Sequence, residues 1–361
     1  MGFLLFFSIF GAFSQISAPV LPEAAPWNEL LNQTSGWLAA DGVYSIRNPE
    51  SRCVYFLFSD TFCGSTQNDG KDFGEGVFMA NHSFVKLTPE GNAEFFVPER
   101  GQNLLPDRYW LQDGTFQGNR LHFTAMIPDP KTWKPLRLDW VSLPFQANGT
   151  PDFANAEIRR NVPLLAQTPK GPVVFGAAFT EDAGDGFLYV FGYLDQREAF
   201  SRKDLVAARV RPSELTNFSA WRFLTRSGWS EDPTQCEPLA EGISCEFSVS
   251  RIPSGPLAGR FLLVDTQNGI SPLIEYRTAP TPTGPFSPPT VCCRVPEHQN
   301  GISAYNSKAH PAISTSETLI LSANLNRLGS LPHHPQEYRP RFFELRWDAL
   351  VLPDSENLQK K

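Results

Sequence analysis

Short hydrophobic runs separated by turn residues form the basic pattern of this chain. The segment LAADGVYSIRNPESRCVYFLFSDTF, from Leu38 to Phe62, is an example: it reads as a β-hairpin with Asp41 near its start and Asp60 near its end. Amphipathic helices need runs of about 10 to 12 residues with apolar positions at a spacing of 3.6. Such runs are almost absent from this chain. The pattern therefore predicts an all-β protein with many turns.

The pattern of the first segment recurs along the chain. Similar segments occupy 109–126, 174–195, 244–268 and 304–326, each with a short strand, a turn and a more hydrophobic strand. The matching positions, separated by 72, 64, 69 and 64 residues, are Asp41, Asp113, Ala177, Glu246 and His310. Units of about 65–70 residues have room for four antiparallel strands, since strands average about 5–6 residues.

Five such units favour radial repetition. We expect a five-bladed β-propeller formed by a single domain over residues 22–351. A pair of β-sandwiches gives no reason for the regular step, and a β-helix repeats at much shorter spacing. Because the innermost strands of a propeller line one channel, equivalent positions should meet at its mouth. One polar pocket is therefore predicted to contain Asp41, Asp113, Glu246 and His310.

The two ends of the chain differ from the rest. The apolar start MGFLLFFSIFGAFSQ is too short to span a bilayer and is typical of a secretory signal peptide, which we place at residues 1–14. Residues 352–361 are a polar C-terminal tail. The sequence has no other long apolar run. We therefore expect a secreted or periplasmic protein without a membrane span, and a monomer.

Charge and cysteine content limit the binding partners, the cellular compartment and the metal sites that the sequence predicts. The net charge is −7 and the basic residues are scattered, which argues against nucleic acid as a partner. The six cysteines suit an oxidising compartment, but 15 pairings exist and the connectivity stays open. The cysteines and histidines lack the spacing of a zinc site. We expect no cofactor, although oxygen ligands from several blades are compatible with a structural Ca²⁺ or Na⁺ in the channel.

Several motifs resemble a known family. GWLAADGVYSI, VYFLFSDTF and YNSKAHPAIS together resemble the secreted family named domain of unknown function 4185, over nearly the whole chain after the signal peptide. That family is similar to five-bladed propeller furanosidases such as arabinanases and β-fructosidases, and some of its members are endo-D-arabinanases. The resemblance implies a propeller that acts on furanose polymers. It does not fix the sugar, because propellers host many activities.

The resemblance also implies roles for particular residues. The furanosidase pattern has an aspartate on the first blade, a glutamate on the fourth and often a histidine on the fifth, which correspond here to Asp41, Glu246 and His310. The intermediate aspartate of the pattern corresponds to Asp113 or to Asp60. The third unit has no carboxylate at the equivalent position, so the second essential carboxylate stays open.

Hydrolysis of a glycosidic bond needs two carboxyl groups. One protonates the leaving oxygen, and the other attacks the sugar or activates water. We expect Asp41 to be the nucleophile or general base and Glu246 or Asp60 to be the acid. A polysaccharide or oligosaccharide substrate would contact nearby polar and aromatic residues, namely Asp113, Trp37, Trp110, Asn81, Asn306, Lys308 and His310.

Other function classes remain open. A non-catalytic carbohydrate-binding propeller predicts the same pocket but no reaction that depends on Asp41. A serine hydrolase fits less well because the chain has no G-x-S-x-G elbow. A sialidase would need an arginine triad, for which Arg277 is a single candidate, and export argues against a glycoside phosphorylase.

Overall fold

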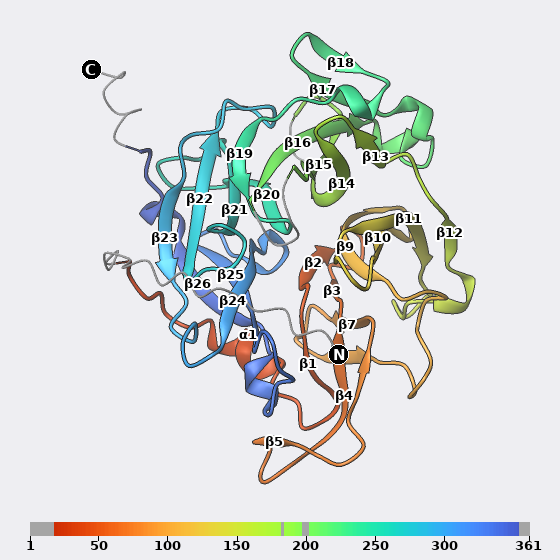
Figure 1. Ribbon diagram of the computed structural model, residues 1–361, viewed down its shortest axis with the longest axis vertical. Helices are drawn as coiled ribbons and strands as arrows, with labels where there is room; N and C mark the ends of the chain where they lie inside the picture. Colours follow the sequence, from red (N-terminus) through yellow and green to blue (C-terminus); the bar gives the residue numbers. More distant parts are fainter. Residues whose placement is uncertain (1–17, 182–183, 197–201, 354–361) are drawn as a thin grey trace.

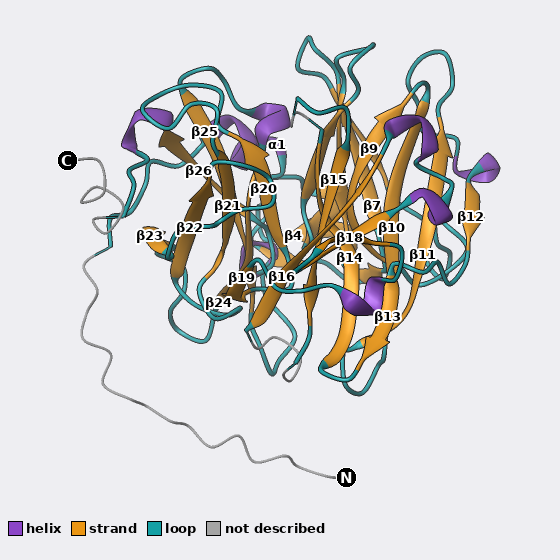
Figure 2. Cartoon of the chain, turned by 90° about the horizontal axis from the view of Figure 1, so that it is seen from above, coloured by secondary structure: helices purple, strands orange, loops and turns teal. Residues whose placement is uncertain are grey.

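The computed structural model describes residues 18–181, 184–196 and 202–353 (Figure 1). These residues form strands β1 to β26 and one α-helix, α1 (Ala25–Leu30), which confirms the predicted all-β class. The predicted signal peptide (1–14) and all but two residues of the predicted tail (352–361) lie outside the described residues. Short 3-10 turns lie in the loops that join the strands (Figure 2), namely η1 (Phe153–Asn155), η2 (Pro212–Glu214), η3 (Phe218–Ala220), η4 (Pro233–Gln235), η5 (Pro311–Ile313), η6 (Pro335–Glu337) and η7 (Trp347–Ala349).

Antiparallel sheets follow one another along the chain, and in Figure 1 they follow one another around the molecule from orange through green to blue. The first contains β2 (Tyr44–Arg47), β3 (Val54–Phe58), β7 (Ser83–Leu87) and β8 (Ala93–Phe96). The second contains β9 (Trp110–Gln117), β10 (Arg120–Pro128), β11 (Pro135–Pro144) and β12 (Glu157–Arg159). In both, each strand pairs with the next strand of its sheet along the chain.

The later sheets vary in width. The third contains β13 (Leu165–Thr168), β14 (Gly171–Thr180), β15 (Leu188–Leu194), β16 (Lys203–Val210), β17 (Arg222–Thr225) and β18 (Gly228–Ser230), and β19 (Ala240–Ile243) also pairs with β16. The fourth contains β20 (Phe247–Arg251), β21 (Phe261–Thr266), β22 (Leu273–Ala279) and β23 (Thr290–Arg294). The fifth contains β24 (Ser303–Ala309), β25 (Thr318–Asn326) and β26 (Arg341–Arg346).

A further small sheet lies beside the first one. It is formed by β1 (Ser35–Ala40), β4 (Thr61–Gln67), β5 (Asp72–Phe73) and β6 (Phe78–Ala80). The segment from Leu38 to Phe62 is thus more than one hairpin, because β2 pairs with β3 while the flanking strands β1 and β4 pair with each other. This second pairing brings the two ends of the segment together.

One strand of each large sheet contacts a strand of the next sheet. β9 packs against β2, β14 packs against β9 and β20, and β24 packs against β20. The turn η5, which follows β24, packs against β2. The contacts therefore run from the first sheet to the fifth and return to the first.

Three of these contacting strands contain a β-bulge where the sequence repeat was aligned. The register shifts between Leu111 and Gly114 in β9, between Phe175 and Ala178 in β14, and between Tyr305 and Lys308 in β24. A bulge bends its strand and redirects the side chains of the extra residues. In β24 the bulge lies at 306–307, so the alignment of His310 with Asp113 is off by three or four residues.

The N-terminal segment completes the fifth sheet. The Ala24 amide donates a hydrogen bond to the Phe342 carbonyl at 2.9 Å, and the Glu344 amide donates to the Pro22 carbonyl at 2.9 Å. Between them, Glu23 forms an antiparallel bridge with Phe343 in β26. The first described residues and the last strand of the chain are therefore joined by backbone hydrogen bonds.

Large aromatic side chains fill the space between the sheets. Trp140, Trp221, Phe175 and Phe223 are almost completely buried in one cluster formed mainly by the second and third sheets. All six cysteines are free thiols, and most of them are buried. In the described part of the chain, no helix is long and apolar enough to cross a membrane.

Candidate active site

Asp41 and Asp60 lie opposite each other where the β1–β4 ladder ends. The Asp41 amide donates a hydrogen bond to the Asp60 carbonyl at 3.2 Å, and the Ser59 amide donates to the Asp41 carbonyl at 2.9 Å. Gly42 follows with a φ of 64°, and a Cβ atom at this position would lie 2.7 Å from the Ser59 hydroxyl. Glycine is therefore required for the tight turn that keeps the two aspartates together.

The Asp41 carboxyl group is held by two tyrosines. The hydroxyls of Tyr305 and Tyr338 both donate to its Oδ2 atom, each at 2.8 Å. Burial, together with the neighbouring carboxylates of Asp60 and Glu246, raises the pKa of Asp41 to about 8, against the opposing effect of the two tyrosine hydrogen bonds. Asp41 is therefore mostly protonated at neutral pH.

The environment of Asp60 raises its pKa less than that of Asp41. Burial raises its pKa to about 6, and a hydrogen bond from the Trp110 side chain opposes this shift. Both aspartates remain partly exposed to solvent. At neutral pH the two neighbouring carboxyl groups consequently differ in charge, because Asp60 is mostly ionised and Asp41 mostly is not.

Glu246 and Lys308 form an ion pair next to the aspartates. Glu246 directly precedes β20, and its Oε2 atom accepts a hydrogen bond from the Lys308 ammonium group. Lys308 is 1% exposed, donates a second hydrogen bond to the Asn306 carbonyl at 3.2 Å, and lies 4.4 Å from the centroid of the Tyr44 ring. The lysine is thus a fixed cation below a glutamate that stays partly exposed.

Asp113 belongs to the same group of charges. It lies at the bulge of β9, and its Oδ2 atom accepts a hydrogen bond from the Phe179 amide at 2.8 Å, which links β9 to β14. Burial raises the pKa of Asp113 to about 7, while hydrogen bonds from the Phe179 and Gly114 amides and the charge of Lys308 oppose the shift. The structure thus brings together carboxyl groups from separate parts of the chain: Asp41, Asp60, Asp113 and Glu246. We call these four residues and Lys308 the carboxylate cluster.

Four of the residues predicted to contact substrate are buried, namely Trp37, Asn306, Lys308 and His310. Two of them, Trp37 and His310, have all their polar side-chain atoms bonded to protein hydroxyls. Trp37 is completely buried, packs on Phe58 and donates its indole N–H to the Ser83 hydroxyl at 3.1 Å. It points into the core because side chains alternate between the two faces of a strand. A residue in this position has no face to offer a ligand.

His310 is the second of these. It is 1% exposed, with Nδ1 at 2.9 Å from the Ser45 hydroxyl and Nε2 at 2.7 Å from the Ser322 hydroxyl. Burial, and to a lesser extent Lys308, lowers the pKa of His310 to about 3. Both ring nitrogens are used by protein hydroxyls, so His310 links the fifth sheet to the first and leaves no nitrogen for a ligand.

Of the other predicted residues, Trp110 and Asn306 contact members of the carboxylate cluster, whereas Asn81 contacts Asn103. Trp110 is partly exposed and bonded to Asp60. Asn306 is mostly buried in the β24 bulge with a φ of 51°, and its carbonyl accepts from Lys308. Asn81 is partly exposed and donates to the Asn103 side chain at 2.9 Å.

Tyr338 is a site residue that the sequence analysis missed. It follows η6, far from any of the repeated segments, yet its hydroxyl reaches Asp41. It also packs edge-on against Phe62 at a centroid distance of 5.1 Å. No local motif marks this tyrosine, because the contact depends on the return of the chain from the fifth sheet to the first.

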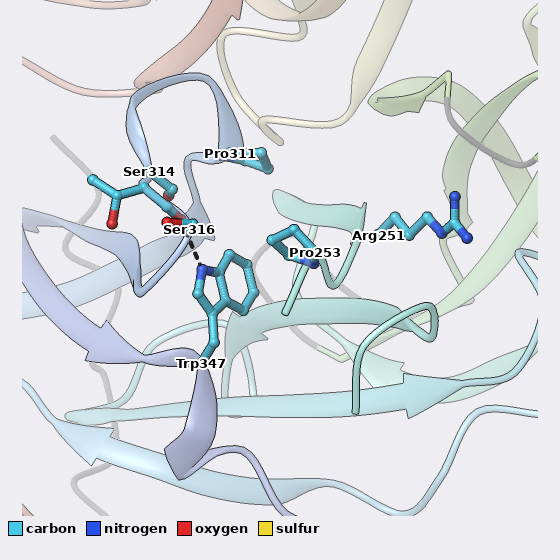
Figure 3. A pocket seen from close by; sticks show the side chains of 7 residues that line it. Arg251, Pro253, Pro311, Ser314, Ser316 and Trp347 are labelled. Atoms are coloured by element: carbon cyan, nitrogen blue, oxygen red, sulfur yellow. Dashed lines mark hydrogen bonds between the residues drawn. The ribbon is translucent and has the colours of Figure 1, made fainter. Parts of the chain in front are cut away.

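A separate surface pocket lies between the end of β20, the loop that follows β24 and the turn that follows β26 (Figure 3). Its volume is about 280 Å³, and Trp347 closes one side with its indole N–H bonded to the Thr315 carbonyl at 3.0 Å. The lining residues are Arg251, Pro253, Pro311, Ser314, Thr315, Ser316 and Trp347. None of these is a carboxylic acid, so the pocket offers no pair of groups for acid–base chemistry.

Within the described residues, no three His, Cys, Asp or Glu side chains are grouped so that they could hold a metal ion. The Ca²⁺ or Na⁺ ion suggested for the channel stays a prediction, because main-chain and amide oxygens could also supply ligands.

Comparison with known proteins corrects one prediction from the sequence. The family model that matches residues 25–347 is described as a domain of unknown function, DUF5005. The predicted resemblance to the family of domain of unknown function 4185 is therefore wrong. A search of curated proteins found no match.

Solved structures with a similar fold include three that differ in how well they superpose. A provisionally assigned hydrolase from Bacteroides ovatus is 18% identical, with a TM-score of 0.68, over 91% of this chain and 90% of that chain. A GH43_1 enzyme from Xanthomonas citri, solved with xylose, is 15% identical with a TM-score of 0.46 over 90% of this chain and 93% of that chain. Bacillus subtilis levansucrase is 8% identical with a TM-score of 0.48 over 86% and 83%. The first of these shows a shared fold, and the other two resemble the chain too weakly to say more.

Proposed function

The chain belongs to the DUF5005 family, and we propose that it is a glycoside hydrolase whose active site is the carboxylate cluster. One observation carries the proposal: Asp41, with its pKa raised to about 8, and Glu246, ion-paired with the buried Lys308, lie in one partly exposed group. Glycoside hydrolysis needs two carboxyl groups whose environments hold them in different protonation states. The two residues have different environments: Asp41 is buried beside other carboxyl groups, and Glu246 accepts a hydrogen bond from the Lys308 ammonium group.

The environments also suggest the role of each carboxyl group. Asp41 is mostly protonated at neutral pH and is suited to donate a proton to the leaving oxygen. Glu246 has a cation beside it and is suited to attack the sugar or activate a water molecule. This order of roles is the reverse of the one expected from the sequence, where Asp41 was the base.

Asp60 and Asp113 complete the proposed site. Asp60 contributes a negative charge that raises the pKa of Asp41, which is a way of keeping the acid protonated. Asp113 is fixed by the Phe179 amide and lies close enough to Lys308 for their charges to interact. We propose that Asp113 binds a sugar hydroxyl opposite the reacting bond.

The proposal also includes the architecture of the protein, its location in the cell and the class of its substrate. We propose a five-bladed propeller, supported by the contacts that lead from the first sheet to the fifth and back. The β-bulges at matching positions in β9, β14 and β24 also support repeated units. The apolar start of the sequence supports export to the cell exterior or periplasm, and an extracellular glycan of the furanose type, such as an arabinan, is the substrate class to test first.

The experiment is a screen of the purified protein on D-arabinan, L-arabinan, fructan, xylan and galactan, with chromatography of the products. With the polymer that is cleaved, Asp41→Asn and Glu246→Gln should each lower kcat by roughly 10²- to 10⁴-fold, the usual contribution of general acid–base catalysis. Asp348→Asn is the control, because Asp348 is exposed and pairs only with Arg346 among the described contacts.

Azide rescue then separates the two roles. Azide should restore turnover of an aryl glycoside by either alanine variant, but the products differ: Glu246→Ala, without its nucleophile, should yield a glycosyl azide of inverted configuration, and Asp41→Ala one of retained configuration. The opposite pattern of configurations would reverse the assignment. If the wild-type protein binds glycans on an array but releases no product from any polymer, the protein is a carbohydrate-binding propeller and the hydrolase proposal fails.

A further inference from the structure

Two stacked tryptophans lead outward from the carboxylate cluster. The rings of Trp110 and Trp133 are nearly parallel, at an interplanar angle of 3° and a centroid distance of 5.7 Å. Trp110 begins β9, and its side chain is hydrogen-bonded to Asp60. Trp133 is 47% exposed. The pair thus connects a carboxyl group of the cluster with an aromatic surface that is open to solvent.

The turn that presents Trp133 is well supported. It joins β10 to β11, and the Asp129 carboxylate accepts hydrogen bonds from the Lys131 and Thr132 amides at 2.8 and 2.7 Å. The Trp133 amide donates to the Asp129 carbonyl at 2.8 Å, and the Asp129 amide donates to the Lys134 carbonyl at 2.8 Å. The turn is therefore built to hold one conformation, with the tryptophan at its end.

Trp133 also has an unfavourable backbone conformation. Its φ is 59°, in the left-handed region that bulky residues seldom adopt. Residues held in such a conformation cluster at functional sites. A glycine or asparagine would fit the turn better, so stability of the turn alone does not explain a large aromatic residue here.

We propose that Trp133 is a platform for one sugar ring of a bound glycan chain, next to the ring whose bond is cleaved. The inference rests on the proposed function and deepens it, because it requires a substrate of at least two linked sugars. The C–H groups of a sugar ring are apolar and slightly positive, and the face of an indole ring is negative. Trp110 stacks on one face of the Trp133 ring and is hydrogen-bonded to Asp60, so it fixes the position of Trp133 relative to the carboxylate cluster.

A sugar fits this surface better than a protein partner does. The exposed aromatic area is a single ring beside polar residues of its own turn, whereas a stable protein interface needs roughly 800 Å² on each partner. The platform is also continuous with a group of carboxylates, which suits the many hydroxyl groups of a glycan.

The test compares two substrates and three variants. The substrates are the polymer found by the screen and the glycosyl fluoride of the same sugar, which has no second ring. Trp133→Ala should raise KM for the polymer by roughly three- to tenfold, the range expected for losing one aromatic stacking contact, and should change kcat/KM for the glycosyl fluoride much less. The KM of Trp133→Phe for the polymer should lie between those of the wild type and Trp133→Ala. Trp229→Ala is the control, because Trp229 is also partly exposed but lies on β18 over Arg209.

The outcomes separate this inference from the proposed function. If the polymer is cleaved and Trp133→Ala leaves its KM unchanged, the platform is refuted while the hydrolase stands. If no polymer is cleaved, tryptophan fluorescence titrated with oligosaccharides still tests the platform, which predicts a saturable change in the wild type that is lost in Trp133→Ala. No change in the wild type would overturn the inference, as would light scattering that shows a dimer dissociated by Trp133→Ala.

Discussion

Removing one hydroxyl group from Tyr338 should shift the pH dependence of activity in a direction that reveals the role of Asp41. Tyr338→Phe deletes one of the two hydrogen bonds to the Oδ2 atom of Asp41 and keeps the ring that packs on Phe62. Hydrogen bonds to a charged group contribute about 1.5–3 kcal/mol, and one pH unit corresponds to about 1.36 kcal/mol. Asp41 is partly exposed and keeps its bond from Tyr305. We therefore take the lower end of this energy range, which corresponds to a rise of about one unit in the pKa of Asp41.

The direction of the pKa shift depends on which form of Asp41, protonated or ionised, the tyrosine hydroxyl stabilises. A hydroxyl donates to the carboxylate, so its loss disfavours the ionised form and raises a pKa that already lies at about 8. If Asp41 is the acid, the protonated form is active and activity is lost as pH rises through this pKa. The alkaline limb of kcat/KM should then move upward by about one pH unit.

The assay is the pH profile of kcat/KM, which reports groups in the free enzyme. Tyr305→Phe should produce a similar shift, since its hydroxyl lies at the same distance from Asp41. Tyr189→Phe is the control, because that hydroxyl donates to the exposed Asp185 at 2.7 Å. A rise of the acidic limb instead would make Asp41 the base. An unchanged profile in a folded Tyr338→Phe protein would refute any role of Asp41 in the titration.

Three further predictions concern stability. The folded protein holds His310 neutral with its pKa lowered to about 3, whereas an unfolded histidine takes up a proton below about 6.5. The free energy of unfolding should therefore fall as pH decreases from about 6.5 towards 3, and urea titrations should show a shallower decrease in His310→Gln. Arg339→Met should cost about 3 kcal/mol in the same titrations, because the buried guanidinium donates to the Leu38 carbonyl at 2.7 Å and to other oxygens that would lose their partner. Gly192→Ala should sharply reduce the yield of folded protein, since its Cβ would lie 1.9 Å from the Val174 carbonyl oxygen; a normal yield would show that β14 and β15 can separate.

Local patterns were sufficient to predict the all-β class and to select the carboxyl residues that the structure brings together in the carboxylate cluster. Alternation and turn residues indicated strands, and the spacing of the repeat singled out Asp41, Asp113 and Glu246. The structure brings these three carboxyl groups together from the segment before β2, from within β9 and from the residue before β20. Asp60 was found for a different reason, since it closes the segment that begins near Asp41.

The sequence misled where strands depart from regular geometry or pair at long range. The repeat aligned His310 with Asp113, but the bulge of β24 lies at 306–307 and His310 lies beyond the end of the strand, so His310 is not at the matching position. Trp37 was expected at the site because it lies near Asp41 in sequence, but the pairing of β1 with β4 turns it into the core. The Tyr338–Asp41 contact joins residues on opposite ends of the chain, and Trp133 depends on a strained turn. Neither leaves a periodic signal.

The backbone bridge between Glu23 and Phe343 can form only after the last strand, β26, has been synthesised. A ribosome releases the chain from its N-terminus, so the segment around Glu23 emerges long before its partner strand has been made. Until β26 emerges, the fifth sheet has an open edge that can pair with another chain. The edge is therefore exposed during synthesis until the last strand is in place.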